Sequence, residues 1–187
     1  MPAAPKRKTA ATSRKDAMLG FLFRRLTAAP ERGSALFDSV TRIAREPHWY
    51  IEGSVPDTID GRFAVLATVT ALVLVRLERD GEAGDLVSVA LTERFIEVME
   101  SEHRELGLGD PTLGRTVRKL VRLLAVRTER WRAATKGEAD WAATAEASLY
   151  KSSVSPNALI HSADRSQRLW AELQELTLTG IEQGKLQ

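Results

Sequence analysis

The sequence predicts an all-α protein: a single compact bundle of about six to seven helices that follows a basic, partly disordered N-terminal tail. Apolar residues recur every three or four positions through most of the chain after residue 33, which places them on one face of a helix. Glycine and proline separate these periodic segments. The β-branched run 65–75 is ambiguous by itself, but the sequence on both sides of it has the helical pattern, so no strand is expected.

Composition narrows the class of protein. A chain of 187 residues with 43% hydrophobic and 28% charged residues is typical of one folded domain. The chain has no cysteine, which excludes disulfides, thiolate metal sites and thiol nucleophiles and fits a reducing compartment. No run reaches the ~18 apolar residues of a membrane span. The N-terminus lacks an export signal, so we expect a cytoplasmic protein.

The N-terminal region carries most of the positive charge. Residues 1–32 hold eight Lys or Arg and two acids, a net charge of +6, so residues 33–187 carry −4 of the total of +2. We expect residues 1–15 to be a disordered basic tail and residues 16–32 to form a short amphipathic helix and a linker. That helix either packs on the protein's own core or lies in an anionic membrane interface. In the second case the contact residues are Lys6, Arg7, Lys8, Leu19, Phe21, Leu22, Phe23, Arg24 and Arg25.

Residues 33–187 are expected to form the helical domain. Its first helix should begin at a Ser34 N-cap and end at Pro47. The segment 46–58 contains two prolines, a glycine and adjacent aromatic residues, which indicates an ordered loop held by Trp49 and Tyr50. The next helix should run from about Thr58 to Asp80, with Gly81 ending it.

Two acids near the start of that helix, Asp57 and Asp60, have two interpretations of equal weight. They cap the helix and interact with its dipole, or they bind a partner. We expect Arg62 to pair with an acid nearby.

The following helices form a charged pair. One should run from about Asp85 to Gly107, and the other from about Thr112 to Lys136 with Val121 and Trp131 on its apolar side. Residues 112–136 contain eight Lys or Arg and one acid, so like charges repel along the helix unless something anionic lies close. The acidic face of the preceding helix, lipid, RNA and a partner protein are all candidates.

The C-terminal part should contain an Ala-rich stretch over 138–150 and a last helix that begins at Ser155-Pro156. The expected core residues of this helix are Leu159, Ile160, Leu169, Trp170, Leu173 and Leu176.

Groups that carry out catalysis are not evident in the sequence. His48, His103 and His161 are too far apart for a local metal site, and glycines form no phosphate-binding loop. We therefore expect neither a metal nor a cofactor, and no catalytic residues. A helical enzyme acting on a quinone or an isoprenoid is conceivable, but no residue requires it.

Two blocks resemble a known family. The first is Pro47-His48-Trp49-Tyr50 followed by Val55-Pro56-Asp57-Thr58-Ile59-Asp60-Gly61-Arg62-Phe63, and the second is Arg104 to Asp110. Both resemble the ubiquinol-cytochrome c chaperone family, over about residues 34–135 and more loosely the last helix. The resemblance implies a helical fold without catalytic activity.

The resemblance also implies a function and partners. The chain would bind newly made cytochrome b, or another complex III subunit, and promote assembly of the ubiquinol-cytochrome c reductase. It would be peripherally associated with the inner membrane, with the ribosome as a further contact. The alternative is a helical nucleic-acid- or ribosome-binding protein, although no sequence-specific nucleic-acid motif is present. The candidate partner-binding residues are Trp49, Tyr50, Pro56, Asp57, Asp60, Arg62, Arg115, Arg118, Lys119, Arg122 and Arg127.

Overall fold

The computed structural model describes residues 33–186 except 106–109, and the side chains of this part except those of 102–105 and 110–117. This part is helical and contains no strand, as predicted. It has seven α-helices and two short 3-10 helices. The helices are α2 (Ser34–Ala44), η1 (Pro47–Trp49), α3 (Ile59–Leu77), η2 (Glu78–Asp80), α4 (Gly81–Glu105), α5 (Asp110–Thr135), α6 (Trp141–Leu149), α7 (Pro156–Glu175) and α8 (Leu178–Glu182). The expected tail and amphipathic helix over 1–32 lie outside the described residues.

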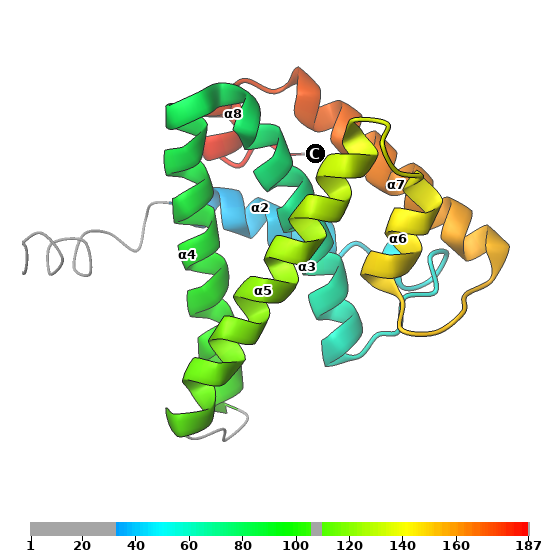
Figure 1. The fold of residues 1–187 in the computed structure, drawn as a ribbon, viewed down its shortest axis with the longest axis horizontal. Coiled ribbons are helices and arrows are strands. Elements are labelled where there is room, and N and C mark those ends of the chain that lie inside the picture. Colours follow the sequence, from blue (N-terminus) through cyan, green and yellow to red (C-terminus); the bar gives the residue numbers. More distant parts are fainter. Residues whose placement is uncertain (1–32, 106–109, 187) are drawn as a thin grey trace, which may run out of the picture. The chain divides into compact units, whose positions relative to one another are not determined.

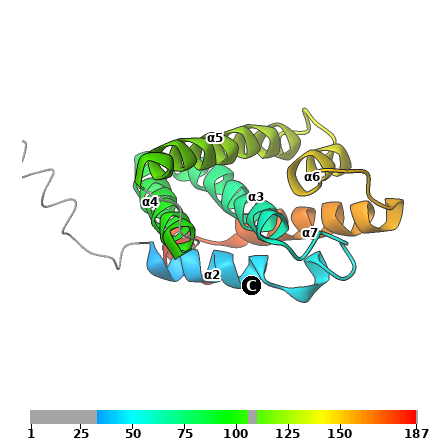
Figure 2. The same cartoon turned by 90° about the horizontal axis from the view of Figure 1, so that it is seen from below.

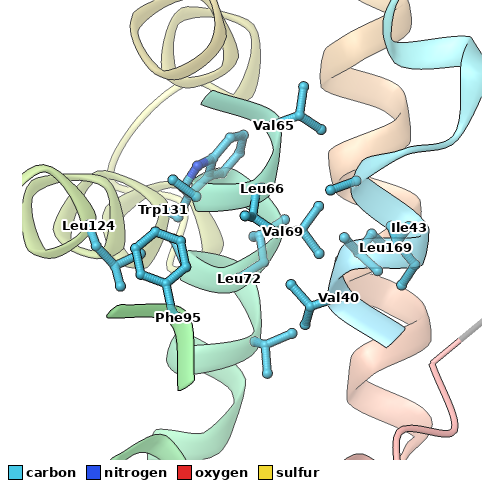
Figure 3. Packing of buried hydrophobic residues seen from close by; sticks show 14 of the residues in the cluster. Val40, Ile43, Val65, Leu66, Val69, Leu72, Phe95, Leu124, Trp131 and Leu169 are labelled. Carbon is cyan, nitrogen blue, oxygen red and sulfur yellow. The ribbon is translucent and has the colours of Figure 1, made fainter. Parts of the chain in front are cut away.

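The central element is α3, which packs between α5 on one side and α2 and α7 on the other (Figures 1 and 2). Its apolar run is buried on all sides, with Val65, Val69 and Leu72 fully inaccessible to solvent. In Figure 3, Leu124, Trp131 and Phe95 meet α3 from one side and Val40, Ile43 and Leu169 from the other. A helix hydrophobic all round is typical of a core position, which confirms the sequence interpretation of this segment.

Helix boundaries differ from the predictions in two places. The N-cap of α2 is Gly33, and Ser34 is the first residue of the helix rather than its cap. The helix α4 begins at Gly81, four residues before the expected start near Asp85. Gly81 has a φ of 55°, so the chain turns there directly from η2 into α4. The glycine expected to end one helix therefore also begins the next.

Two residues assigned to apolar faces are exposed instead. Val121 of α5 is 37% exposed and Ile160 of α7 is 56% exposed. Each lies at the margin of its helix's apolar stripe, where the spacing alone does not separate the last core position from the first solvent position. Of the other expected core residues of the last helix, Leu169 and Leu173 are buried as predicted, and Leu159, Trp170 and Leu176 are half-buried against the core.

The C-terminal segment is attached to the bundle by buried and half-buried polar contacts. Arg76 of α3 is fully buried and donates to the carbonyl oxygens of Leu173 at 2.9 Å and Leu176 at 2.5 Å. These carbonyls belong to the end of α7, where the helix has no partners of its own for them. Ser39 and Arg42 of α2 donate to the carbonyls of Gly184 and Leu186. Polar side chains of α2 and α3 thus fix the chain beyond residue 173.

Candidate functional site

A groove of about 1370 Å³ lies between α2, η1, the start of α3, α4 and α5. Much of its lining is apolar, including Phe37, Phe63, Leu66, Val98, Met99, Leu120 and Leu123. The charged residues that line it are Asp38, Arg45, Asp57, Asp60, Arg62, Arg94 and Lys119. A lining that combines apolar side chains with charges of both signs is typical of a surface that binds another chain.

One wall of the groove is the loop between α2 and α3, and its aromatic residues hold it in place. Trp49 is buried, and its Nε1 donates to the carbonyl of Ile43 at 3.0 Å. The hydroxyl of Tyr50 donates to the carbonyl of Ala44 at 2.8 Å. Both acceptors are carbonyls in the last turn of α2, where a helix supplies few backbone donors. The loop is therefore ordered, as predicted, and presents Tyr50 to the groove.

The start of α3 is fixed by a cap and by a close backbone contact. Thr58 is the N-cap, and its Oγ1 accepts from the backbone N–H of Gly61 at 3.2 Å. A Cβ on Gly61 would lie 1.9 Å from the carbonyl oxygen of Pro56, so a larger residue there would displace the loop. The succession of Pro56, Thr58 and Gly61 builds this corner of the groove.

The two acids at this corner are paired rather than capping. Arg62 donates from Nε to Asp57 Oδ1 at 2.6 Å, as expected, and Lys151 donates to Asp60 Oδ2 at 2.6 Å. The Arg62 hydrogen bond lowers the pKa of Asp57, and the Lys151 hydrogen bond lowers that of Asp60. Both carboxylates are exposed. They remain ionised near neutral pH and accessible from the groove.

The cations of α5 fall into two groups. In its C-terminal half, Arg132 pairs with Glu78 at 2.5 Å and with Glu129. Arg127 donates to the carbonyl of Ser148 at 3.1 Å, lies over the ring of Phe63, and has its pKa lowered by burial. Arg130 donates to the carbonyl of Ala147 at 3.0 Å. These cations are used inside the fold.

The cations in the N-terminal half of α5 differ. Arg118, Lys119 and Arg122 are exposed, and none of the three forms an ion pair with a described acid. Of the three, only Lys119 lines the groove. The acids of α4 whose side chains are described therefore form no ion pair with these three cations, and those of 102 and 105 lie outside the described side chains.

The structure brings five of the predicted partner-binding residues together at the groove: Tyr50, Asp57, Asp60, Arg62 and Lys119. The others lie elsewhere. Trp49 is in the core, Arg127 is partly buried against α6, and Pro56 is exposed beside the groove corner. The side chain of Arg115 and the candidate membrane contacts in the tail lie outside the described residues.

The groove also uses residues that the sequence analysis did not single out. Asp38, Thr41 and Arg45 come from α2, and Arg94 comes from α4. The side-chain oxygen of Thr41 and Nε of Arg94 are buried and form no hydrogen bond with the described residues. The spacing of Asp38, Thr41 and Arg45 along one face of α2 was the available signal, but it is equally typical of a solvated face.

Two histidines that are far apart in the sequence meet beside this loop. His48 Nδ1 lies 3.2 Å from His161 Nε2, and His48 Nε2 lies 3.0 Å from Glu46 Oε2. Arg165 contacts the same carboxylate at 3.4 Å. Burial is the main cause of a lowered pKa for His48. No group of three His, Asp or Glu that could hold a metal is found within the described residues.

Comparison with known proteins identifies the family. A model of the family described as ubiquinol-cytochrome C chaperone matches residues 52–185. The chain belongs to this family. The match includes the block from Val55 to Phe63 and all of α6, α7 and α8, and so covers the last helix, where the resemblance was looser. Pro47 to Tyr50 lie just before it.

The fold has a counterpart among solved structures. The crystal structure of the Cbp3 homolog from Brucella abortus aligns with a TM-score of 0.72 over 90% of this chain and 94% of that chain. The two sequences are 22% identical, so this likeness establishes the fold alone. No curated protein matches the chain significantly. No helix in the described ranges has the length and apolar character needed to cross a membrane.

Proposed function

We propose that this chaperone binds newly made cytochrome b in the groove between α2, α3, α4 and α5 and thereby promotes assembly of the ubiquinol-cytochrome c reductase. The observation that carries the proposal is the position of the family block. Its residues Asp57, Ile59, Asp60, Arg62 and Phe63 line the groove, and they lie inside the range that the family model matches.

The size of the groove favours a polypeptide over a small molecule. Sites for small ligands enclose about 300–1000 Å³, whereas this groove measures about 1370 Å³. A lining that combines apolar and charged side chains suits an amphipathic helix, which would place its apolar side chains against the apolar lining. A single quinone ring or a short isoprenoid would leave much of the groove unfilled.

The setting of this activity is part of the proposal. Cytochrome b is a membrane protein, so its chaperone would meet it where it is inserted if the chaperone is a peripheral protein on the cytoplasmic side of the inner membrane. The basic residues of the tail, from Lys6 to Arg25, would supply attraction to anionic lipid. The ribosome that makes the client is a further proposed contact.

A photocrosslinking experiment tests the client site. A photoreactive amino acid placed at Ile59, which lines the groove and is 65% exposed, should crosslink to cytochrome b in cells that are assembling the complex. The matched control is Ile160 on α7, which is 56% exposed and lies outside the groove. Equal crosslinking from both positions, or none from Ile59, would contradict the proposal.

A genetic test addresses the outcome for the complex. Deletion of the gene should lower the amount of assembled complex III, measured on native gels, and the wild-type gene should restore it. A gene carrying Ile51→Asp and Ile59→Asp should not restore it, whereas one carrying Ile160→Asp should. All three isoleucines are exposed, so these changes alter surface chemistry and leave the core intact. Unchanged complex III in the deletion strain would remove the central claim.

A further inference from the structure

The N-terminal half of α5 has a surface composition that its own fold does not explain. Residues 110–122 contain four Lys or Arg and one acid, Asp110. Arg118 and Arg122 are exposed and form no ion pair with a described acid. Cations at i and i+4 on one helix face repel each other. An anionic partner on this face would relieve that repulsion.

Exposed apolar side chains accompany these cations. Val121 is 37% exposed and Val126 is 42% exposed, and the short side chain of Ala125 between them is exposed as well. On a helix, residues 118, 121, 122 and 125 share one face. The face therefore presents a strip of apolar carbon flanked by guanidinium groups.

The position of α5 leaves this face open. Figure 2 shows α5 along one edge of the bundle, with α3 on its inner side and α2 on the opposite edge. Lys119, Leu120 and Leu123 are the residues of α5 that line the groove. The lining does not include Arg118, Val121, Arg122 or Val126. The face is the convex outside of a single helix, which offers no cleft for a peptide.

We propose that this outer face of α5, made by Arg118, Val121, Arg122, Ala125 and Val126, rests on an anionic lipid surface. Cations at the headgroups with apolar side chains at the edge of the acyl region are the arrangement of a helix that lies in a membrane interface. RNA fits less well, because proteins bind its bases by stacking them on exposed aromatic side chains. Trp131, the sole aromatic residue of α5, is fully buried.

The consequence is an orientation for the molecule. Lys119 lies next to this face and lines the groove, so a membrane contact through α5 would bring the groove's edge to the level of the headgroups. The lipid contact is a separate surface from the groove, and its test gives the same answer whether or not the client proposal holds.

The first test measures binding of the full chain to vesicles. Full-length protein should bind phosphatidylglycerol-containing vesicles and not phosphatidylcholine vesicles in a sedimentation assay. Removing two bases near an anionic surface weakens binding about 30-fold, so Arg118→Gln with Arg122→Gln should show a loss of this size. The control, Arg168→Gln with Lys185→Gln, makes the same change of charge at exposed positions of α7 and the C-terminal segment. An equal loss in the control would overturn the proposal.

The second test separates α5 from the basic tail. The chain has no cysteine, so Val121→Cys can be labelled alone with an environment-sensitive fluorophore. Its emission should shift to the blue with anionic vesicles and be quenched by lipid-borne quenchers, while the same label at Ile160→Cys should respond to neither. Vesicle binding without a shift at position 121 would mean that another segment holds the membrane, and would overturn the proposal. So would RNA binding that depends on Arg118 and Arg122 without a lipid signal.

Discussion

The two halves of α5 carry similar charges and use them differently. In the C-terminal half, Arg127 and Arg132 bond to α6 and to η2. In the N-terminal half, Arg118 and Arg122 face solvent without a described acidic partner. The difference arises because the hydrogen bonds from α5 to α6 and η2 in the described part of the chain come from its C-terminal half, through Arg127, Arg130 and Arg132. Positive residues along one helix can therefore have two roles. Those in the C-terminal half of α5 stabilise the bundle, and those in the N-terminal half are available to a partner.

The largest effect is expected from replacing a cation whose bonds all lie inside the fold, Arg76 of α3. Arg76→Met should lower the free energy of unfolding by about 3 kcal/mol, because the carbonyls of Leu173 and Leu176 lose their donor and Asp80 loses its partner. Urea denaturation measures the change. Arg79→Met, three residues further on, removes two long hydrogen bonds of 3.3 Å to Gln174 at an exposed position, and it should lower stability by about 0.5 kcal/mol or less. Similar losses in both variants would contradict the internal role of Arg76.

The comparison within α5 itself is tested by one substitution in each half. Arg127→Met should cost about 1–2 kcal/mol of unfolding free energy, because the Ser148 carbonyl loses a charged donor in a partly buried site. Arg122→Met should leave stability nearly unchanged and weaken vesicle binding instead. Thermal or urea unfolding of both variants, with vesicle sedimentation alongside, separates the two effects. A stability loss at Arg122 as large as that at Arg127 would break the distinction.

The start of α3 offers the same contrast between a structural and an accessible residue. Thr58→Ala should cost about 1 kcal/mol, because the N–H of Gly61 loses its cap. Asp60→Ala should leave the melting temperature unchanged, since Asp60 is exposed and pairs with Lys151 at the surface. Capture of cytochrome b by the Asp60→Ala variant should fall if the groove binds the client. A variant with normal capture and normal stability would mean that Asp60 has neither role.

The smallest effect expected concerns pH and the histidine pair. The pKa of His48 lies below its ordinary value of 6.5, mainly through burial, with Arg165 and His161 adding to the effect and Glu46 opposing it. The folded protein therefore binds fewer protons here than the unfolded chain does. The stabilisation is fully present above the ordinary pKa and decreases as the pH falls from there toward the folded-state pKa.

Wild-type protein should accordingly lose more unfolding free energy between about pH 7 and about pH 5 than His48→Gln does. The measurement is a series of urea titrations across this range for both proteins. Exposed carboxylates contribute to both curves, so the difference between the two proteins isolates His48. Parallel curves would show that protonation of His48 does not oppose folding.

Much of the architecture was available from the sequence because it follows from local rules. The apolar run of α3 and the Ser155-Pro156 pair predicted helices that the structure confirms. Arg62 was expected to pair with an acid nearby for the same reason, and the acid is Asp57, five residues away. Trp49 and Tyr50 hold the loop as predicted, because adjacent aromatic residues in a short loop have few ways to be buried.

Other features depended on which elements pack together. The groove combines residues from α2 to α5, and His48 meets His161 across 113 positions of sequence. Arg76 resembled any arginine near the end of a helix until α7 placed its last carbonyls beside it. Hydrophobic spacing fixes which side of a helix faces inward, but it contains no information about which neighbour arrives there. The sequence by itself therefore determined the helices and the family block, and tertiary packing decided the groove, the partners of the buried polar groups and the half of α5 left open.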